Sequence, residues 1–173
     1  MHRTYVLVAC LCLIGLAIRT GYELLKKLGR VGTNTRAVFA VVFVAMCLML
    51  SSWPVMCPRD PWRIAVPEFA RWISLGLLVV ALGLAMGGLL QLRGLENIDH
   101  LVTTGLFSRL RHPMYVGFIL WILGWVVRYG AVVSLAAGVL CIGNILYWRQ
   151  LEERALESQY GEDYRSYRRA TWF

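Results

Sequence analysis

The chain has 173 residues, of which 58% are hydrophobic and only 16% are charged, and its mean hydropathy is +0.59. A soluble domain of this size would carry about a quarter charged residues. The composition therefore excludes an ordinary soluble protein and indicates an integral membrane protein. In that setting the net charge of +8 reflects topology and contact with anionic membrane lipids, and we expect no nucleic-acid partner.

Five intervals without a charged residue predict the membrane helices, and in chain order they cover residues 4–18, 37–58, 72–92, 113–127 and 129–148. The second, third and fifth reach the ~20 residues that a spanning helix needs. The two shorter intervals can span if the flanking arginines snorkel to the interface. The first could instead be the apolar core of a signal peptide, but no small-residue cleavage site follows it, which favours a retained helix.

We therefore predict an all-α fold, a polytopic membrane helical bundle of about five transmembrane helices with a C-terminal cytoplasmic helix. A single membrane domain covers residues 1–173, with the N-terminal transmembrane helices in 1–100 and a helical hairpin with a cytoplasmic tail in 101–173. Most lysines and arginines fall on the side of the membrane that holds the C-terminus. The positive-inside rule makes that side cytoplasmic and places the N-terminus outside, as in a bacterial inner membrane or its equivalent.

Glycines predict two features of the packing. Gly76, Gly83 and Gly87 fall at spacings of seven and four in the third apolar interval. They share one helix face and would allow a neighbouring helix to approach closely. Gly130 lies between the last two intervals, where it suits a tight outer turn.

The cysteines and histidines do not predict a metal site. The five cysteines contain no Cys-x-x-Cys pair, and most of them lie inside apolar intervals, where cysteine behaves as a small hydrophobe. His2 and His100 have no cysteine or carboxylate at the spacing of metal ligands. We expect neither a bound metal nor a disulfide framework.

A first polar cluster lies just before the fourth apolar interval. Pro113 suits the first turn of a helix, and Arg109, Arg111 and His112 come directly before it. The free N–H groups and the partial positive charge of a helix N-terminus favour an anion beside these side chains. The alternative is a set of arginines that only fixes the membrane topology.

A second polar cluster follows the fifth interval. Arg149, Glu152 and Glu153 stand at i, i+3 and i+4, so they can share one helix face. Acidic residues at a membrane boundary are costly unless they are solvated or paired. Either Arg149 and Glu153 form a surface pair worth ~0.3–0.5 kcal/mol, or a glutamate binds a ligand. Because both clusters lie at the cytoplasmic ends of the final hairpin, they can build one site.

Four short motifs follow one another in this half of the chain: Gly105-Leu106-Phe107, Arg111-His112-Pro113-x-Tyr115-x-Gly117, Glu152-Glu153 and Tyr160-Gly161-x-x-Tyr164-x-x-Tyr167. In order and spacing they resemble the isoprenylcysteine carboxyl methyltransferase superfamily, integral membrane enzymes that include phospholipid N-methyltransferases. The resemblance covers roughly residues 101–169. The N-terminal helices carry no recognised motif.

The resemblance implies a binding site for S-adenosyl-L-methionine between the last two membrane helices and the C-terminal segment. Arg111, His112, Pro113 and Tyr115 would surround the amino-acid end of the cofactor. Glu152 and Glu153 would hold its ribose or amine, and Gly117 would permit close approach. Arg149 and Glu153 would act in catalysis. A lipophilic small molecule or lipid would enter from the bilayer as the methyl acceptor.

A carboxylate is the favoured acceptor, because it is already ionised and needs no general base, and because Arg149 could orient an anion. An amine must lose a proton, for which His112 or a glutamate would be the base. Methylation of a lipid amine is therefore the second hypothesis. A nicotinamide-dependent membrane reductase and a membrane protein without enzymatic activity are alternatives of other classes.

Overall fold

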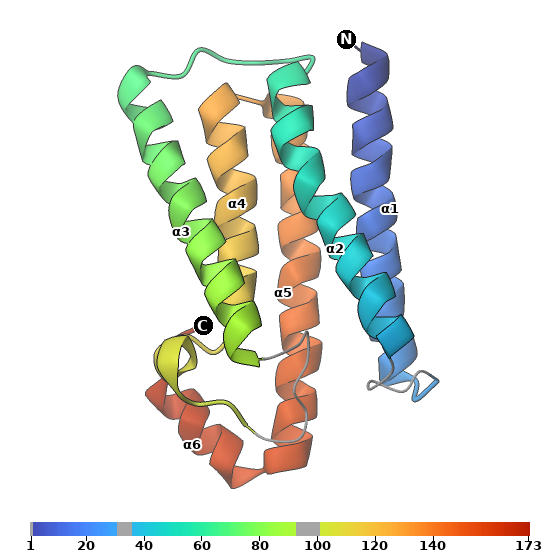
Figure 1. The fold of residues 1–173 in the computed structure, drawn as a ribbon, viewed down its shortest axis with the longest axis vertical. Helices are drawn as coiled ribbons and strands as arrows, with labels where there is room; N and C mark the ends of the chain where they lie inside the picture. The colour runs from blue at the N-terminus through green and yellow to red at the C-terminus, as the bar shows by residue number, and fades with distance from the viewer. Residues whose placement is uncertain (1, 31–35, 93–100) are drawn as a thin grey trace.

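The computed structural model describes residues 2–30, 36–92 and 101–173, and these residues form a bundle of α-helices (Figure 1). The helices are α1 (His2–Lys27), α2 (Arg36–Met56), α3 (Glu68–Leu92), α4 (Pro113–Tyr129), α5 (Val132–Tyr160) and α6 (Glu162–Ala170), with two short 3-10 helices, η1 (Cys57–Arg59) and η2 (Gly105–Ser108). The described residues contain no β-sheet, only two isolated bridges. The predicted all-α membrane bundle is confirmed.

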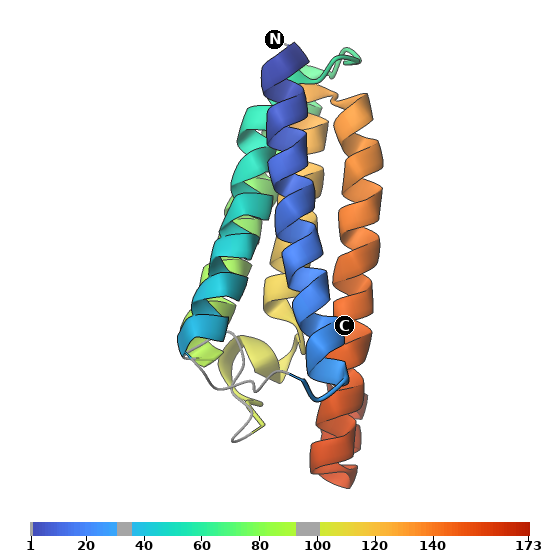
Figure 2. The ribbon, with the colours of Figure 1, turned by 90° about the vertical axis from the view of Figure 1, so that its right-hand side faces the viewer.

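Four of the helices, α1, α2, α3 and α5, are long and apolar enough to cross a membrane. The shorter α4 has 17 residues, which corresponds to about 25 Å and falls slightly short of a bilayer core of about 30 Å. By contrast, α5 has 29 residues and a length of about 44 Å. Its last turns therefore extend beyond α3 and α4, as both views of the ribbon show (Figures 1 and 2).

The helices associate as two pairs joined through α5. The most extensive contacts are those of α1 with α2 and of α3 with α4, while α5 packs on α4 and on α1. Figure 2 shows α1 and α5 running side by side. Within the described residues, α2 and α3 have at most slight contact with each other. The two pairs are therefore joined mainly through α5, with a smaller contact between α2 and α4.

The close approach of α3 and α4 depends on glycines of α4. A Cβ atom on Gly117 would lie 2.7 Å from the carbonyl oxygen of Ala81, and one on Gly124 would lie 2.8 Å from Leu78. Gly76 and Gly83 have no atom within 4 Å of such a Cβ position. The predicted packing role is wrong for Gly76 and Gly83, because their face points away from the bundle. Gly87, the third glycine of the prediction, faces Leu106 of η2 and not a neighbouring helix, and the α3 glycine that does meet α4 is Gly88, at the Met114 side chain.

The end of the bundle at which α5 begins is closed by a carboxylate. Asp60 Oδ2 accepts hydrogen bonds from the backbone N–H and the hydroxyl of Ser134, both at 2.6 Å, at the start of α5. Gly130 ends α4 in a left-handed conformation, with φ of 59°, and its carbonyl accepts a hydrogen bond from the backbone of Ile64. The predicted tight turn at Gly130 is confirmed, and the loop before α3 is attached to it.

The first helix is longer than its charge-free interval. Arg19 and Glu23 are buried within α1 and form an i, i+4 ion pair, so the helix continues to Lys27 instead of ending near Ile18. Thr20 on the same helix accepts a hydrogen bond of 3.2 Å from the Trp148 indole of α5. A charge that the sequence places at a membrane boundary is thus an internal part of the bundle.

The glycine contacts predict the stability of two matched variants. Gly117→Ala should lower stability by about 1–3 kcal/mol, because the new methyl group meets backbone atoms of α3. Gly83→Ala should leave stability unchanged or raise it by up to ~1 kcal/mol, since it removes backbone freedom without a clash. Thermal unfolding in one detergent compares them. Equal midpoints for the two variants would show that α3 and α4 do not pack through Gly117.

Candidate functional site

The two polar clusters of the sequence meet at one carboxylate. Glu153 Oε1 accepts hydrogen bonds from Arg111 Nε at 3.2 Å and from Arg149 Nε at 3.3 Å. His112 Nε2 lies 3.4 Å from the same oxygen, and His112 Nδ1 lies 3.7 Å from Glu152 Oε2. Glu153 is only 8% exposed. Three basic side chains thus surround one buried carboxylate. Arg149 lies on the same helix as Glu153, whereas Arg111, 42 residues before Glu153, and the adjacent His112 come from the start of α4.

Two helix boundaries place these groups together. His112 is the N-cap of α4 and Pro113 occupies the first turn, so Arg111 and His112 lie at the exact point where α4 begins. The extra length of α5 carries Glu152 and Glu153 past the apolar part of that helix to the same level. The predicted helix start at Pro113 is confirmed, and it fixes the height of the first cluster in the bundle.

The C-terminal segment is attached over this site. Gly161 ends α5, and α6 turns back so that the Tyr167 hydroxyl donates a hydrogen bond of 2.6 Å to the carbonyl of Phe107. Arg111 Nη1 donates to the carbonyl of Thr171 at 2.6 Å, and the Trp172 backbone exchanges hydrogen bonds with residues 109 and 111. Arg111 therefore joins three segments: the start of α4, the end of α5 and the chain after α6.

Arg149 has a different environment from the one expected for an acceptor-binding group. Its guanidinium lies over the Phe173 ring, 4.3 Å from the ring centroid, and it also binds Glu153. Arg149 is not among the residues that line the cavity described below. Its role in catalysis stays a prediction, and its observed contacts are with Glu153 and the end of the chain.

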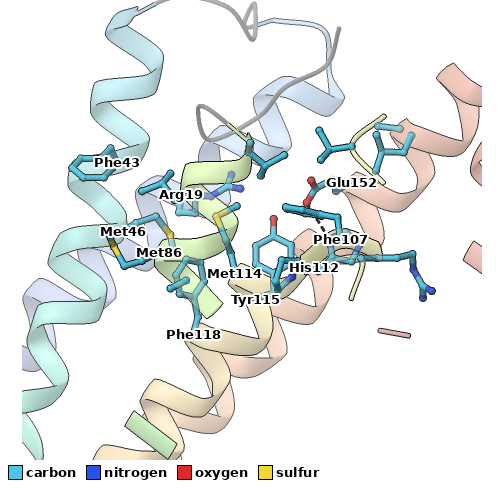
Figure 3. Close-up of a pocket in the computed structure, with 18 of the residues that line it drawn as sticks. Arg19, Phe43, Met46, Met86, Phe107, His112, Met114, Tyr115, Phe118 and Glu152 are labelled. Carbon is cyan, nitrogen blue, oxygen red and sulfur yellow. Dashed lines mark ion pairs between the residues drawn. The ribbon is translucent and has the colours of Figure 1, made fainter. Parts of the chain in front are cut away.

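A cavity of about 440 Å³ adjoins the site (Figure 3). Its polar end is lined by Arg111, His112, Glu152, Tyr164 and Tyr167. Its larger part is apolar and is lined by residues of α2, α3 and α4, among them Phe43, Met46, Met86, Met114 and Phe118. The volume is in the range of about 300–1,000 Å³ that is usual for small-molecule sites. The cavity therefore suits a ligand with one polar and one apolar end.

The residues named for the cofactor divide into two groups. Those that line the cavity are Arg111, His112, Pro113, Tyr115 and Glu152. Two others are placed differently: Gly117 faces the backbone of α3, and Glu153 lies behind Arg111, which it binds, and beside His112. The structure thus places most of the predicted residues in the wall of the cavity. Glu153 lies outside that wall and contacts the side chains that form it.

Two buried polar atoms at the polar end have no hydrogen-bond partner among the described residues, His112 Nε2 and the Tyr164 hydroxyl. The 3.4 Å separation of His112 Nε2 from Glu153 does not have the geometry of a hydrogen bond. Burial raises the pKa of Tyr164 well above its ordinary value, and that of Tyr167 to about 12. Tyr164 therefore keeps its proton, and its hydroxyl can donate a hydrogen bond to a ligand.

The N-terminal helices contribute residues that the motifs did not indicate. Arg19 of α1 and several side chains of α2 line the cavity. A signal for Arg19 was present in the sequence, since Arg19 and Glu23 stand at i, i+4 at the end of an apolar interval, a spacing that allows two charges to neutralise each other. No group of three or more metal-ligating side chains occurs in the part of the chain that the structure describes.

The fold and the site define an all-α membrane protein with a polar site at one end of its bundle. The phospholipid methyltransferase family matches residues 72–163, from the start of α3 into α6. This match covers more than half of the chain, and the chain belongs to that family.

Three curated relatives are similar to parts or most of the chain. The protein-S-isoprenylcysteine O-methyltransferase of Schizosaccharomyces pombe is 40% identical over 76 residues, which cover 43% of this chain and 32% of that protein. The Xenopus laevis enzyme of the same name is 30% identical over 118 residues, covering 57% and 38%. The chloroplastic 15-cis-zeta-carotene isomerase of Arabidopsis thaliana is 27% identical over 172 residues, covering 93% and 47%.

The chain spans about a third to a half of the length of these relatives. No solved structure matches it significantly. The family assignment therefore rests on the matched region, which contains Arg111, His112 and Glu152 of the polar end and both helices of the final hairpin.

The burial of Glu153 predicts a stability difference between two neighbouring glutamates. Glu153→Gln should destabilise the protein by on the order of 3 kcal/mol, because it leaves Arg111 and Arg149 without their shared carboxylate. Glu152→Gln should cost less than about 1 kcal/mol, since the Glu152 side chain is partly exposed. Thermal unfolding midpoints in detergent measure both. A Glu153→Gln midpoint as high as that of Glu152→Gln would contradict the supporting role of Glu153.

Proposed function

We propose that this protein transfers a methyl group from S-adenosyl-L-methionine to a lipophilic acceptor at the cytoplasmic face of the membrane, with a carboxylate as the favoured acceptor. One observation carries the proposal. A cavity has a polar end and an apolar body, and Arg111, His112 and Glu152 of its polar end lie in the region that matches the phospholipid methyltransferase family, at the junction of the two predicted clusters.

The residues at the polar end fit this cofactor. It has a carboxylate and an ammonium group at one end and ribose hydroxyls in the middle. The buried His112 Nε2 and Tyr164 hydroxyl lack partners and can bind such groups, while Arg111 favours the carboxylate and Glu152 the ammonium or the hydroxyls. The N-terminus of α4 adds a partial positive charge beside the same position.

S-adenosyl-L-methionine supplies an electrophilic methyl group on a positively charged sulfur. The contribution of the chain is mainly to hold the acceptor in line with that methyl group, and such positioning can supply several kcal/mol of the barrier. An acceptor carboxylate oxygen forms the new O–CH₃ bond with a lone pair while the sulfur–methyl bond breaks and leaves a neutral thioether. No proton has to be removed, so neither His112 nor Glu152 has to act as a base in this reaction.

Glu153 and Arg149 support this arrangement from behind. Glu153 binds Arg111 and lies beside His112, so it fixes the side chains that face the ligand. Arg149 binds Glu153 and stacks on Phe173, which attaches the end of the chain to α5. We assign both residues to the positioning of the site, with Glu153 acting through Arg111 and His112.

Methylation of a phospholipid amine is the second candidate, and the description of the matched family favours it. This reaction needs a group that takes a proton from the amine. His112 and Glu152 line the cavity and are the available bases. The two candidates share the cofactor site and differ only in the acceptor.

The cofactor assignment predicts binding to the purified protein. S-adenosylmethionine and S-adenosylhomocysteine should bind with a micromolar Kd (about −8 kcal/mol) in calorimetry. His112→Ala and Glu152→Gln should weaken binding at least tenfold, because both side chains face the ligand. The exposed Arg165→Met on α6 is the control and should bind as the unchanged protein does. Folded protein that gives no heat with either ligand would exclude the proposal.

The nature of the acceptor predicts the alkali lability of the product. Membranes that contain the protein, incubated with cofactor labelled in its methyl group, should release volatile methanol after mild base, since a methyl ester is cleaved and an N-methyl group is not. Membranes with the Glu152→Gln variant provide the background. Label that stays in methylated ethanolamine after hydrolysis would contradict the carboxylate hypothesis and support a phospholipid amine as the acceptor.

A further inference from the structure

A buried arginine from the first helix forms part of the cavity wall. Arg19 lies outside the matched region of residues 72–163, yet it lines the cavity together with residues of α2, α3 and α4. Figure 3 shows its guanidinium on the side of the cavity that also holds Met46, Met86 and Tyr115. None of the motifs in the second half of the chain accounts for it.

The position of Arg19 is held from several sides. Glu23 binds its Nη1 from one turn further along α1. The rings of Tyr22 and Trp148 lie 5.4 and 5.2 Å from the guanidinium carbon. Because Trp148 belongs to α5 and also donates to Thr20, the arginine is fixed between two helices. It is a pre-positioned cation with little freedom to move.

A buried ion pair is by itself a weak explanation of stability. Removing two charges from water is costly, and buried ion pairs are often no more stable than apolar side chains of the same size. Ionisable residues within membrane helices are mostly functional for that reason. Glu23 explains how Arg19 is tolerated in α1, but it does not explain why a cation stands at the cavity wall.

The groups around Arg19 connect it to the polar end. The Tyr115 ring stacks on the His112 imidazole, with centroids 5.4 Å apart. Its hydroxyl points between Arg19 and Glu152 in Figure 3 and interacts electrostatically with both. Arg19 and His112 therefore stand on opposite sides of Tyr115, and a group bound by Arg19 faces the place proposed for the cofactor.

The apolar body of the cavity leads away from Arg19 between two helices. Phe43, Met46 and Leu50 of α2 line one side, and Leu82, Met86 and Leu89 of α3 line the other. These helices have at most slight contact with each other in the described part of the chain, and the cavity is not fully enclosed. A single apolar chain bound in this part of the cavity would lie between α2 and α3.

We propose that Arg19 binds the anionic head of the methyl acceptor, a single-chain amphiphile with a carboxylate, whose apolar chain lies between α2 and α3. This inference rests on the proposed function and names the specificity-determining residue of its acceptor site. A guanidinium carries five N–H donors, so one that binds Glu23 through Nη1 can bind a second carboxylate. Arg149, which stacks on Phe173 outside the cavity lining, is not required for this step.

Binding of three probes tests the inference. The probes are S-farnesylcysteine with its free carboxylate, the neutral amide of the same compound, and S-adenosylhomocysteine. The double variant Arg19→Met, Glu23→Met removes both charges without leaving one of them unpaired. It should raise the Kd of the carboxylate probe at least tenfold while the Kd values of the amide and of S-adenosylhomocysteine change less than twofold. Arg165→Met, Glu157→Met removes an exposed ion pair of α5 and α6 and should change none of the three.

The unchanged protein provides a second measurement if the double variant is poorly folded. It should bind the carboxylate at least tenfold more tightly than the amide, and Arg19→Lys, which keeps the charge beside Glu23, should lose only part of this preference. Equal affinities for carboxylate and amide, or a folded double variant that keeps the preference, would overturn the role of Arg19. If the preference depends on Arg19 but S-adenosylhomocysteine does not bind, the anion site stands and the proposed methyl transfer fails.

Discussion

The buried carboxylate of Glu153 connects the parts of this protein that the candidate site requires. It accepts hydrogen bonds from Arg111 before α4 and from Arg149 on its own helix, and it lies beside His112. A single charge at this position cannot stay buried without its partners. The beginning of α4, the end of α5 and the segment after α6, which Arg111 also binds, are therefore held in one arrangement.

The length of α5 makes this arrangement possible. Its apolar part is long enough to cross the bilayer, and the additional turns carry Glu152 and Glu153 to the level at which α4 begins. The shorter α4 starts at Pro113, so the level of its N-terminus within the bundle is fixed as well. The difference in length between two antiparallel neighbours thus creates a polar site at the membrane boundary without a separate soluble domain.

The two halves of the chain contribute different kinds of residue to the cavity wall. Residues at the start of α4 and at the end of α5 form most of the polar end and lie in the region matched by the family, and Tyr164 and Tyr167 of α6 complete it just beyond that region. Helices α1, α2 and α3 supply the apolar wall and Arg19. In the proposed function, the first set holds the cofactor and the second selects the acceptor. This division explains how a common cofactor site can serve different acceptors, because the wall that contacts the acceptor lies largely outside the shared motifs.

The sequence by itself determined the membrane bundle, the start of α4 at Pro113 and the turn at Gly130. Its motifs also predicted that Arg111, His112 and Glu152 belong to one site. These features depend on local properties: the length of charge-free intervals, the missing N–H group of proline and the freedom of glycine at positive φ. The placement of both clusters at the same end of the hairpin follows from the same intervals.

Only the tertiary structure decided which faces pack and which charged groups line the cavity. Gly117 and Gly124 allow α3 and α4 to approach, while Gly76 and Gly83 do not take part, and hydropathy cannot distinguish a face toward lipid from a face toward another helix. In the same way, the sequence indicates that Arg19 and Glu23 can pair but not that Trp148, 129 positions after Arg19, holds the arginine at the cavity wall. Such contacts join residues that are distant along the chain, and local patterns carry no information about them.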